Sequence, residues 1–192
     1  MTVLLLSVAL IALPPGTLVD RVIAVVDKEV ITHSELIKEA RVALVKKAGE
    51  RAASGELGPE FLARFLDDVL ISQVLVAAQT RRLGSVEVSQ EEVDGEIERF
   101  ARMFRTRASH AAFLRRYDIS DAALRNILRR DLRNGRYLDQ RKRAWRVRAG
   151  PNADSGYQRD REALEEYLQE LRSAADLRML SPSGGLERQE AE

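Results

Sequence analysis

Residues 19–36 constrain the fold of this chain more than any other stretch. They read Val-Asp-Arg-Val-Ile-Ala-Val-Val-Asp-Lys-Glu-Val-Ile-Thr-His-Ser-Glu-Leu. Residues 22–26 are β-branched or small, which is typical of a buried strand, and a polar turn separates them from residues 30–31. Thr32 and Glu35 have the spacing of a capping box, in which each side chain accepts from a backbone N–H of the other residue. The stretch therefore predicts a short hairpin that leads directly into a helix.

The spacing of apolar residues in the rest of the chain predicts a mostly helical domain. Two short strands, near residue 22 and over residues 176–180, are marginal alone, so we expect them to pair with each other. The predicted fold class is mostly α, a multi-helix domain closed by a small β-ribbon that joins an N-terminal strand to a C-terminal strand. Helices are expected over residues 34–48, 59–83, 89–104, 109–117, 120–145 and 161–174.

Several helix boundaries carry their own signals. Ser89 and Glu92 repeat the spacing of a capping box, and Ser109 and Ser120 are the expected N-caps of two later helices. Gly84 should end the helix at residues 59–83, because glycine readily adopts the left-handed conformation of a helix C-cap. That helix is apolar on more than one face, which favours a central position in the core. Residues 49–58 contain three glycines and predict a mobile loop.

The ends of the chain suggest export and a single folded domain. Residues 3–13 form an uncharged apolar run of signal-peptide length, too short to span a bilayer. We expect residues 1–17 to be a signal peptide and the protein to be periplasmic; the n-region and cleavage site are atypical, and the alternative is a buried N-terminal helix. One domain should comprise residues 18–148 and 159–181. A short linker at residues 149–158 and a disordered tail at residues 182–192 complete the chain.

Composition limits the chemistry that is available to the chain. The 192 residues include 31 Lys and Arg against 30 Asp and Glu, so the molecule is not a polycation built for nucleic acid. Cysteine is absent, which excludes disulfides, thiol catalysis and the common zinc sites. His33 and His110 are interpreted as polar residues near helix ends, so no catalytic, cofactor-binding or metal-ligating residue is expected. No cofactor is expected either.

Basic residues concentrate in one predicted helix. A solvated face is favoured, partly paired with Glu162, Glu165, Glu166 and Glu170 of the last helix. Binding to nucleic acid is the alternative, because a run of arginines on one helix suits a phosphate backbone. The ten basic residues are Arg125, Arg129, Arg130, Arg133, Arg136, Arg141, Lys142, Arg143, Arg146 and Arg148.

Taken in order, several motifs resemble the SurA-like periplasmic chaperones. The resemblance covers residues 19–36, the helix at residues 61–83 with its continuation to residue 92, the Tyr-Asp-Ile-Ser run at residues 117–120 before the Arg-rich helix, and the end at residues 163–180. Members of that family carry parvulin-type isomerase domains before the returning helix and strand. Only residues 148–158 occupy that position here, too few for a domain. The resemblance therefore implies the chaperone core without isomerase activity.

The resemblance also implies a function and a partner. We expect an ATP-independent chaperone, a holdase that binds unfolded outer-membrane or secreted proteins through an apolar cleft. Neither a stable membrane span nor a nucleic-acid partner is expected, and the distant closing strand would permit a strand-swapped homodimer. The alternatives are an isomerase-related enzyme, a basic helical nucleic-acid-binding protein and an assembly subunit. Candidate client-binding residues are Phe61, Phe65, Phe100, Met103, Phe104, Phe113 and Tyr117.

Overall fold

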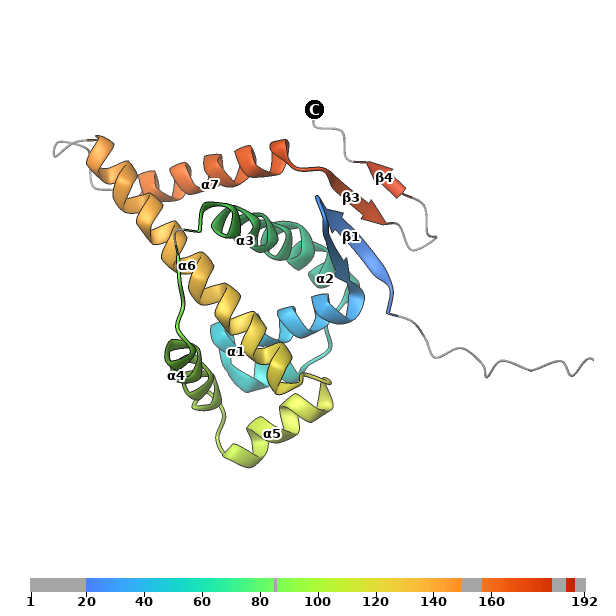
Figure 1. Cartoon of the computed structure of the whole chain (residues 1–192). Coiled ribbons are helices and arrows are strands. Elements are labelled where there is room, and N and C mark those ends of the chain that lie inside the picture. The colour runs from blue at the N-terminus through green and yellow to red at the C-terminus, as the bar shows by residue number, and fades with distance from the viewer. Residues whose placement is uncertain (1–19, 85, 150–156, 181–185, 189–192) are drawn as a thin grey trace, which may run out of the picture.

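The computed structural model describes residues 20–84, 86–149, 157–180 and 186–188. Helices make up most of these residues, and a small sheet lies at one side of them (Figure 1). The mostly α fold class is therefore confirmed. In chain order the elements are β1 (Val22–Val26), β2 (Glu29–Thr32), α1 (His33–Ser54), α2 (Pro59–Phe65), the π-helical turn η1 (Leu66–Leu70), α3 (Ile71–Leu83), α4 (Gln90–Ala101), α5 (Arg107–Arg116), α6 (Asp121–Ala149), α7 (Tyr157–Ala174), β3 (Leu177–Leu180) and β4 (Leu186–Arg188).

The two ends of the chain meet in the sheet, as the sequence predicts. The strand order is β2-β1-β3-β4, and β1 pairs antiparallel with β3 so that Ala24 faces Met179 and Val26 faces Leu177. The turn between β1 and β2 adds a second link to the C-terminal segment. The Asp27 N–H donates to the Asp176 carbonyl at 2.8 Å, and the Asp27 carboxylate accepts from the Asp176 N–H at 2.9 Å. Both strands of the predicted β-ribbon are thus held by backbone hydrogen bonds.

Parts of the predicted domain limits differ from the structure. Within the expected disordered tail, Leu186–Arg188 form β4 and pair antiparallel with β3. The main chain of an edge strand offers hydrogen bonds to any extended segment, so β4 needs no apolar pattern that the sequence would reveal. α6 extends to Ala149 and α7 begins at Tyr157, which shortens the predicted linker at residues 149–158 from both sides. The predicted signal peptide, residues 1–17, lies outside the described residues.

The helix after the hairpin continues beyond its predicted end. Gly49 breaks it with φ 81°, a backbone angle that glycine adopts without strain, but residues 50–54 are helical again rather than a loop. The buried Arg41 side chain explains the difference. Its guanidinium donates to the Ala53 carbonyl and, at 2.5 Å, to the Gly55 carbonyl, so these C-terminal acceptors of the helix are satisfied.

The single helix predicted over residues 59–83 is divided by the π-helical turn η1. Gly84 ends α3 in the left-handed conformation with φ 61°, as predicted. The Ser89–Glu92 capping box of α4 is present in both directions, and Ser120 caps α6. The predicted N-cap of α5, Ser109, lies one helical turn after the N-cap in the structure. Thr106 is the N-cap, and Ser109 is the third residue of the helix, where its side chain completes a capping box with Thr106.

Two apolar cores share α1 and α6. The first core lies between the sheet, α2, η1, α3 and α7, and it contains Val26, Leu70, Ile71, Leu171 and Leu177. The central position predicted for the helix at residues 59–83 is therefore confirmed. α1 directs Leu36 and Ala40 into this core, and α6 contributes Tyr137.

The second core lies between α4, α5 and the first turns of α6. Phe100, Phe113, Leu124 and Leu128 are buried there. The same α1 that supplies the first core supplies this one with residues further along the helix, such as Val42 and Val45. Because both long helices cross from one core to the other, the two cores are parts of one folded unit.

The Asp27 turn yields a stability prediction. Asp27 has φ 54°, which Asp and Asn tolerate better than Ala, and its carboxylate accepts the Asp176 N–H. We expect Asp27→Ala to lower the free energy of unfolding by about 1–2 kcal/mol. Asp27→Asn keeps both the acceptor and the tolerance and should stay within about 0.5 kcal/mol of the wild type. Urea denaturation measures both, and equal losses in the two variants would contradict the proposed link.

Candidate functional site

Four of the seven candidate client-binding residues are buried. Phe65 belongs to the first core, whereas Phe100, Phe104 and Phe113 belong to the second. The last three stack edge-on in a row, with ring centroids 5.5 Å apart between Phe100 and Phe104 and 5.2 Å apart between Phe104 and Phe113. These side chains hold helices together and offer no surface in this conformation.

Tyr117 and Met103 lie beside the second core but apart from Phe61. The Tyr117 hydroxyl donates to the Ser54 carbonyl at 3.1 Å, and the Arg41 guanidinium lies 4.1 Å from the centre of its ring. This half-buried tyrosine therefore fastens α5 to the end of α1. Met103, 40% exposed, lies in the turn after α4. The structure does not bring the seven candidates together.

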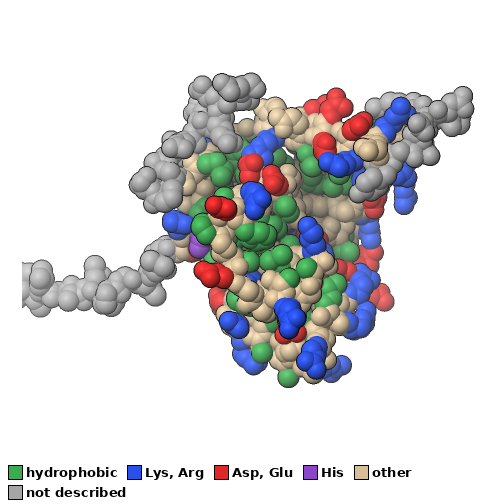
Figure 2. Space-filling model, turned by 180° about the vertical axis from the view of Figure 1, so that it is seen from behind, with side chains coloured by type: hydrophobic (Ala, Val, Ile, Leu, Met, Phe, Trp, Pro, Cys, Tyr) green, Lys and Arg blue, Asp and Glu red, His purple; other side chains and the backbone are tan. Residues whose placement is uncertain are grey.

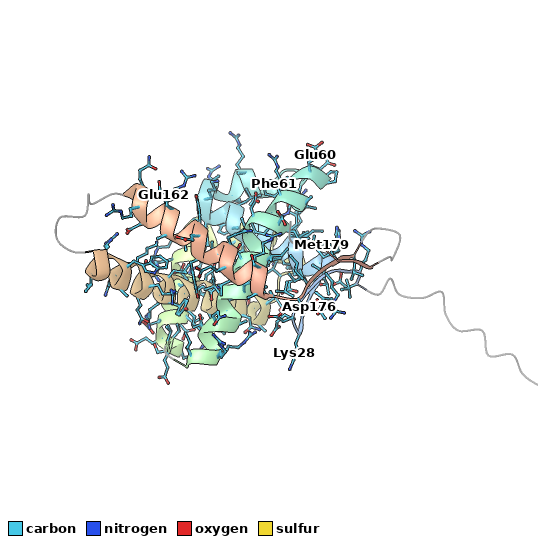
Figure 3. All side chains as sticks on the ribbon, turned by 90° about the horizontal axis from the view of Figure 1, so that it is seen from above. Lys28, Glu60, Phe61, Glu162, Asp176 and Met179 are labelled. Carbon is cyan, nitrogen blue, oxygen red and sulfur yellow. The ribbon has the colours of Figure 1, made fainter. Side chains whose placement is uncertain are left out.

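Phe61 lies on an apolar patch that the sequence interpretation did not assemble. The patch consists of half-buried residues packed against the first core from α2, α7, the turn after α7 and β3. Figure 2 shows hydrophobic side chains gathered in the middle of the rear face, with charged side chains around them. Viewed from above, Phe61 and Met179 both lie to the rear of α7 (Figure 3). We call this surface the α2–α7 patch: Phe61, Leu62, Leu168, Ala175 and Met179.

An arginine fixes α7 beside this part of the molecule. The half-buried Arg172 side chain of α7 donates to the Asp67 carbonyl at 3.0 Å and forms an ion pair with the Asp67 carboxylate. Asp67 belongs to η1, where the wider π-helical turn interrupts the regular hydrogen bonding of the helix. One guanidinium thus satisfies both a carbonyl and a carboxylate of the same residue. The contact sets the position of α7 relative to the segment that carries Phe61.

Both helices that contribute to the patch also carry exposed acidic side chains. Glu60, next to Phe61 on α2, and Glu162, in the first turns of α7, are both exposed (Figure 3). An apolar surface surrounded by charge is the usual arrangement where a folded protein binds another chain. The patch is a surface formed by half-covered side chains, in contrast to the apolar cleft that the sequence interpretation expects.

A second, charged site lies between α1, α3 and α6. It is a cleft of about 690 Å³, within the usual range of ligand sites. We call it the basic cleft, because five cations and three carboxylates line it. The cations are Lys38, Arg81, Arg129, Arg130 and Arg133, and the carboxylates are Glu29, Glu35 and Glu39.

Glu39 is the most buried charged residue of the basic cleft. It is 5% exposed, and its Oε1 atom lies 2.6 Å from Nη2 of Arg130 on α6. Burial raises the pKa of Glu39 to about 7, against the opposing effect of the Arg130 charge. Burial also raises the pKa of Glu35, one turn earlier on α1. Sequence reasoning missed this pair because nothing in the pattern relates α1 to a residue so far along the chain.

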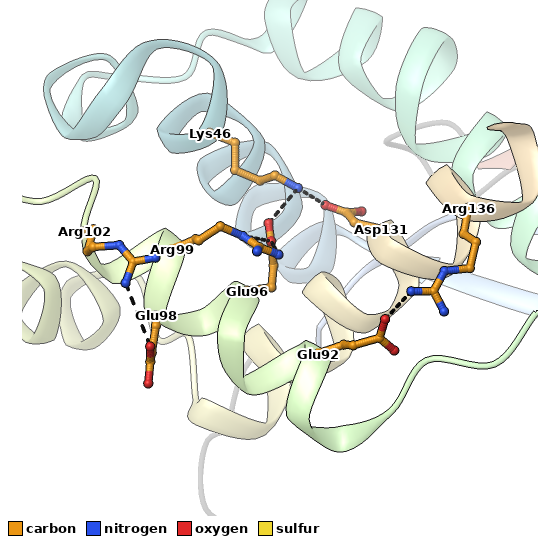
Figure 4. Close-up of polar contacts among 8 residues, drawn as sticks. All are labelled: Lys46, Glu92, Glu96, Glu98, Arg99, Arg102, Asp131 and Arg136. Atoms are coloured by element: carbon orange, nitrogen blue, oxygen red, sulfur yellow. Dashed lines mark hydrogen bonds and ion pairs between the residues drawn. The ribbon is translucent and has the colours of Figure 1, made fainter.

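The basic helix α6 is partly neutralised, but mainly by partners other than the predicted ones. One acidic residue of α6, Asp131, is itself engaged by Lys46 of α1 at 2.8 Å, and Lys46 also lies 3.9 Å from Glu96 of α4 (Figure 4). Arg136 pairs with Glu92, also on α4 (Figure 4). From the last helix, Asp160 pairs with Arg146, whereas the four predicted glutamates form no ion pair with α6 in the described part of the chain. α4, which precedes α6 in the sequence, supplies two of the partners, Asp94 and Glu92.

The two histidines differ in their surroundings. The ring of His110 packs against Phe100 and Phe104, with centroids 5.8 and 5.1 Å away, and burial lowers its pKa. His33 is the first residue of α1. Across residues 20–84, 86–149, 157–180 and 186–188, no three His, Asp or Glu side chains are grouped as a metal ion would require. In the same ranges, no helix has both the length and the apolar character needed to cross a membrane.

Comparison with known proteins adds no relative. No protein-family model matches the chain, and no curated protein matches it significantly. The resemblance to SurA-like chaperones therefore rests on the sequence motifs alone.

The pKa of Glu39 predicts how stability depends on pH. Between the ordinary value of 4.5 and about 7, the folded state binds a proton that the unfolded chain has lost. The free energy of unfolding contributed by Glu39 therefore falls as the pH rises through this interval. We expect the total change to be up to about 3 kcal/mol. Glu39→Gln should remove this slope, as measured by urea denaturation from pH 5 to pH 8.

Glu98→Gln provides the matched control. Glu98 is an exposed carboxylate on α4, so this substitution removes the same charge without a buried partner. Its slope of stability against pH should follow that of the wild type. An unchanged slope in Glu39→Gln would show that the buried pair does not set the pH dependence.

Proposed function

We propose that this protein is an ATP-independent periplasmic holdase that binds unfolded outer-membrane or secreted proteins at the α2–α7 patch. The observation that carries the proposal is the group of half-buried apolar side chains from α2, α7, the turn after α7 and β3, on a face where Figure 2 shows hydrophobic side chains together with charged ones. Extended client segments would bury their own apolar side chains against it, at about 25 cal/mol per Å². No energy source is needed for such binding, and release follows from folding of the client.

Two features of the patch suit a client of variable sequence. Phe61 and Met179 supply an aromatic and a flexible thioether side chain, and both types adapt to different apolar partners. The exposed acidic residue Glu60, next to Phe61, keeps this part of the surface hydrated. The motifs shared with SurA-like chaperones support the same interpretation independently of the patch.

The ion pairs of α6 argue against the nucleic-acid alternative. A helix that binds a phosphate backbone needs cations that are free to replace counterions. Here Arg125, Arg130 and Arg136 are engaged by Asp94, Glu39 and Glu92, which would repel phosphates. A salt-dependent mobility shift with DNA or RNA would favour that alternative over the holdase.

The holdase proposal predicts suppression of aggregation. A urea-denatured porin is diluted into buffer with and without an equimolar amount of the protein, and light scattering is followed without ATP. We expect the protein to abolish most of the scattering. Full scattering, together with no binding to unfolded porin peptides, would overturn the proposal. A proline-isomerisation assay on a short peptide should give only the background rate, and catalysis there would favour the isomerase-related alternative.

A substitution locates the client site. Phe61→Gln removes the aromatic ring from the patch while retaining helix propensity. We expect it to raise the protein concentration needed for half-suppression about fivefold, because burial of an aromatic side chain is partly lost. Leu83→Gln and Met103→Gln remove apolar side chains that are 54% and 40% exposed outside the patch, and they should have little effect. Equal effects of all three would place client binding elsewhere.

A further inference from the structure

The arginines of α6 differ in how their charge is balanced. Arg125 and Arg130 are half-buried and each has a carboxylate partner, Asp94 and Glu39 respectively. Arg129 is also half-buried, but it donates to the neutral amide oxygen of Gln90 at 2.8 Å. Arg133 is half-buried, and no carboxylate of the described residues pairs with it. A partly desolvated cation without a counter-charge is unfavourable, so these two positions call for a negative group from outside the chain.

Both unbalanced arginines line the basic cleft. Arg129 and Arg133 are four residues apart on α6 and therefore lie on the same side of the helix. Their neighbours in the cleft are partly apolar, since Ala77, Ala123 and Ile127 also line it. The cleft thus combines a pair of planar hydrogen-bond donors with an apolar wall, which suits an organic anion better than a hydrated inorganic one.

We propose that the basic cleft binds a carboxylate group between Arg129 and Arg133. Guanidinium groups bind carboxylates through paired, charge-assisted hydrogen bonds, so two of them can hold one carboxylate firmly. Five cations face three glutamates in the cleft, and Lys38 also pairs with Asp118 at 3.0 Å, so the ionised cleft keeps one net positive charge, enough for a single anion. A polyphosphate backbone would meet repulsion from Glu29, Glu35 and Glu39. The proposal does not depend on the α2–α7 patch or on holdase activity.

Glu39 makes this binding depend on pH. The charged groups around it are Arg130, Asp131 and Arg133 of α6, Glu35 and Lys38 of α1, Arg81 of α3 and Glu29 of β2. When Glu39 takes up a proton, the pair with Arg130 loses its negative member and the cleft gains one net positive charge. A carboxylate ligand is then attracted more strongly, so the site binds better in mildly acidic solution than in alkaline solution.

Titration calorimetry with three short, otherwise uncharged peptides tests the proposal. The first peptide has a free C-terminal carboxylate, and the second has a C-terminal amide. The third has a C-terminal amide and one residue replaced by aspartate, so that its only carboxylate is on a side chain. We expect the first or the third to bind and the second to bind at least about tenfold more weakly, because a charge-assisted hydrogen bond is lost. The comparison of the first and third identifies the source of the carboxylate. Equal binding of all three would overturn the proposal, as would preferential binding of a DNA oligonucleotide.

Substitutions on α6 locate the site. Arg133→Gln and Arg129→Gln should each weaken carboxylate binding about tenfold. Arg143→Gln is the matched control, because Arg143 lies on the same helix, is exposed and lies outside the basic cleft. Binding by Arg143→Gln should stay within twofold of the wild type, and thermal unfolding of each variant confirms that it is folded. If Arg143→Gln weakens binding as much as Arg133→Gln, the peptide is attracted by the overall positive charge of α6. That result would overturn the proposed site between Arg129 and Arg133.

The pH dependence of binding is measured with the same peptides. We expect the wild type to bind the carboxylate about fivefold more tightly at pH 6 than at pH 8. Glu39→Gln should show a smaller change, since its side chain is uncharged at both values. Any contribution from histidines is common to both proteins and cancels in the comparison. An equal change in both would overturn the role assigned to Glu39.

Discussion

The pairing of β1 with β3 is the contact on which the rest of the structure depends. It joins residues from opposite ends of the chain, and the Asp27–Asp176 hydrogen bonds add to it at the turn. The loop that it closes includes every helix, so the entropy lost on pairing is large and must be offset by packing. Val26 and Leu177 provide part of that packing because they face each other in the sheet and are both buried in the first core.

The position of α7 follows from this closure. β3 begins shortly after α7 ends, so fixing β3 against β1 brings α7 back onto α3 and η1, where Arg172 holds Asp67. Tyr167 of α7 then reaches Tyr137 of α6, with the two hydroxyl oxygens 2.7 Å apart. The α2–α7 patch exists only because of this return, since its residues come from segments far apart in sequence. The patch, and with it the proposed holdase activity, would therefore be lost with the sheet even if every helix remained formed.

Sequence patterns predicted the elements better than the surfaces. The strands that pair, the caps at Ser89 and Ser120 and the end at Gly84 are local signals, and the structure has them. The continuation of α1 past Gly49 was missed because it depends on Arg41, whose contacts lie across a turn. That the seven candidate client-binding residues are not brought together in the structure has a related reason. An aromatic stripe such as Phe100 with Phe104 indicates which face is apolar, but whether another helix covers that face depends on tertiary packing.

The Arg-rich helix shows how one element can serve both structure and binding. At Arg125, Arg130 and Arg136 the guanidinium is met by a carboxylate from α1 or α4, and these contacts set how the helices pack. Arg129 and Arg133 are half-buried but have no carboxylate partner among the described residues. They lie one helical turn apart and line the same cleft, beside a glutamate whose own charge changes near neutral pH, so their two charges face a confined space. A field confined in this way favours a single small anion over an extended polyanion, which is why the basic composition of α6 does not imply nucleic-acid binding.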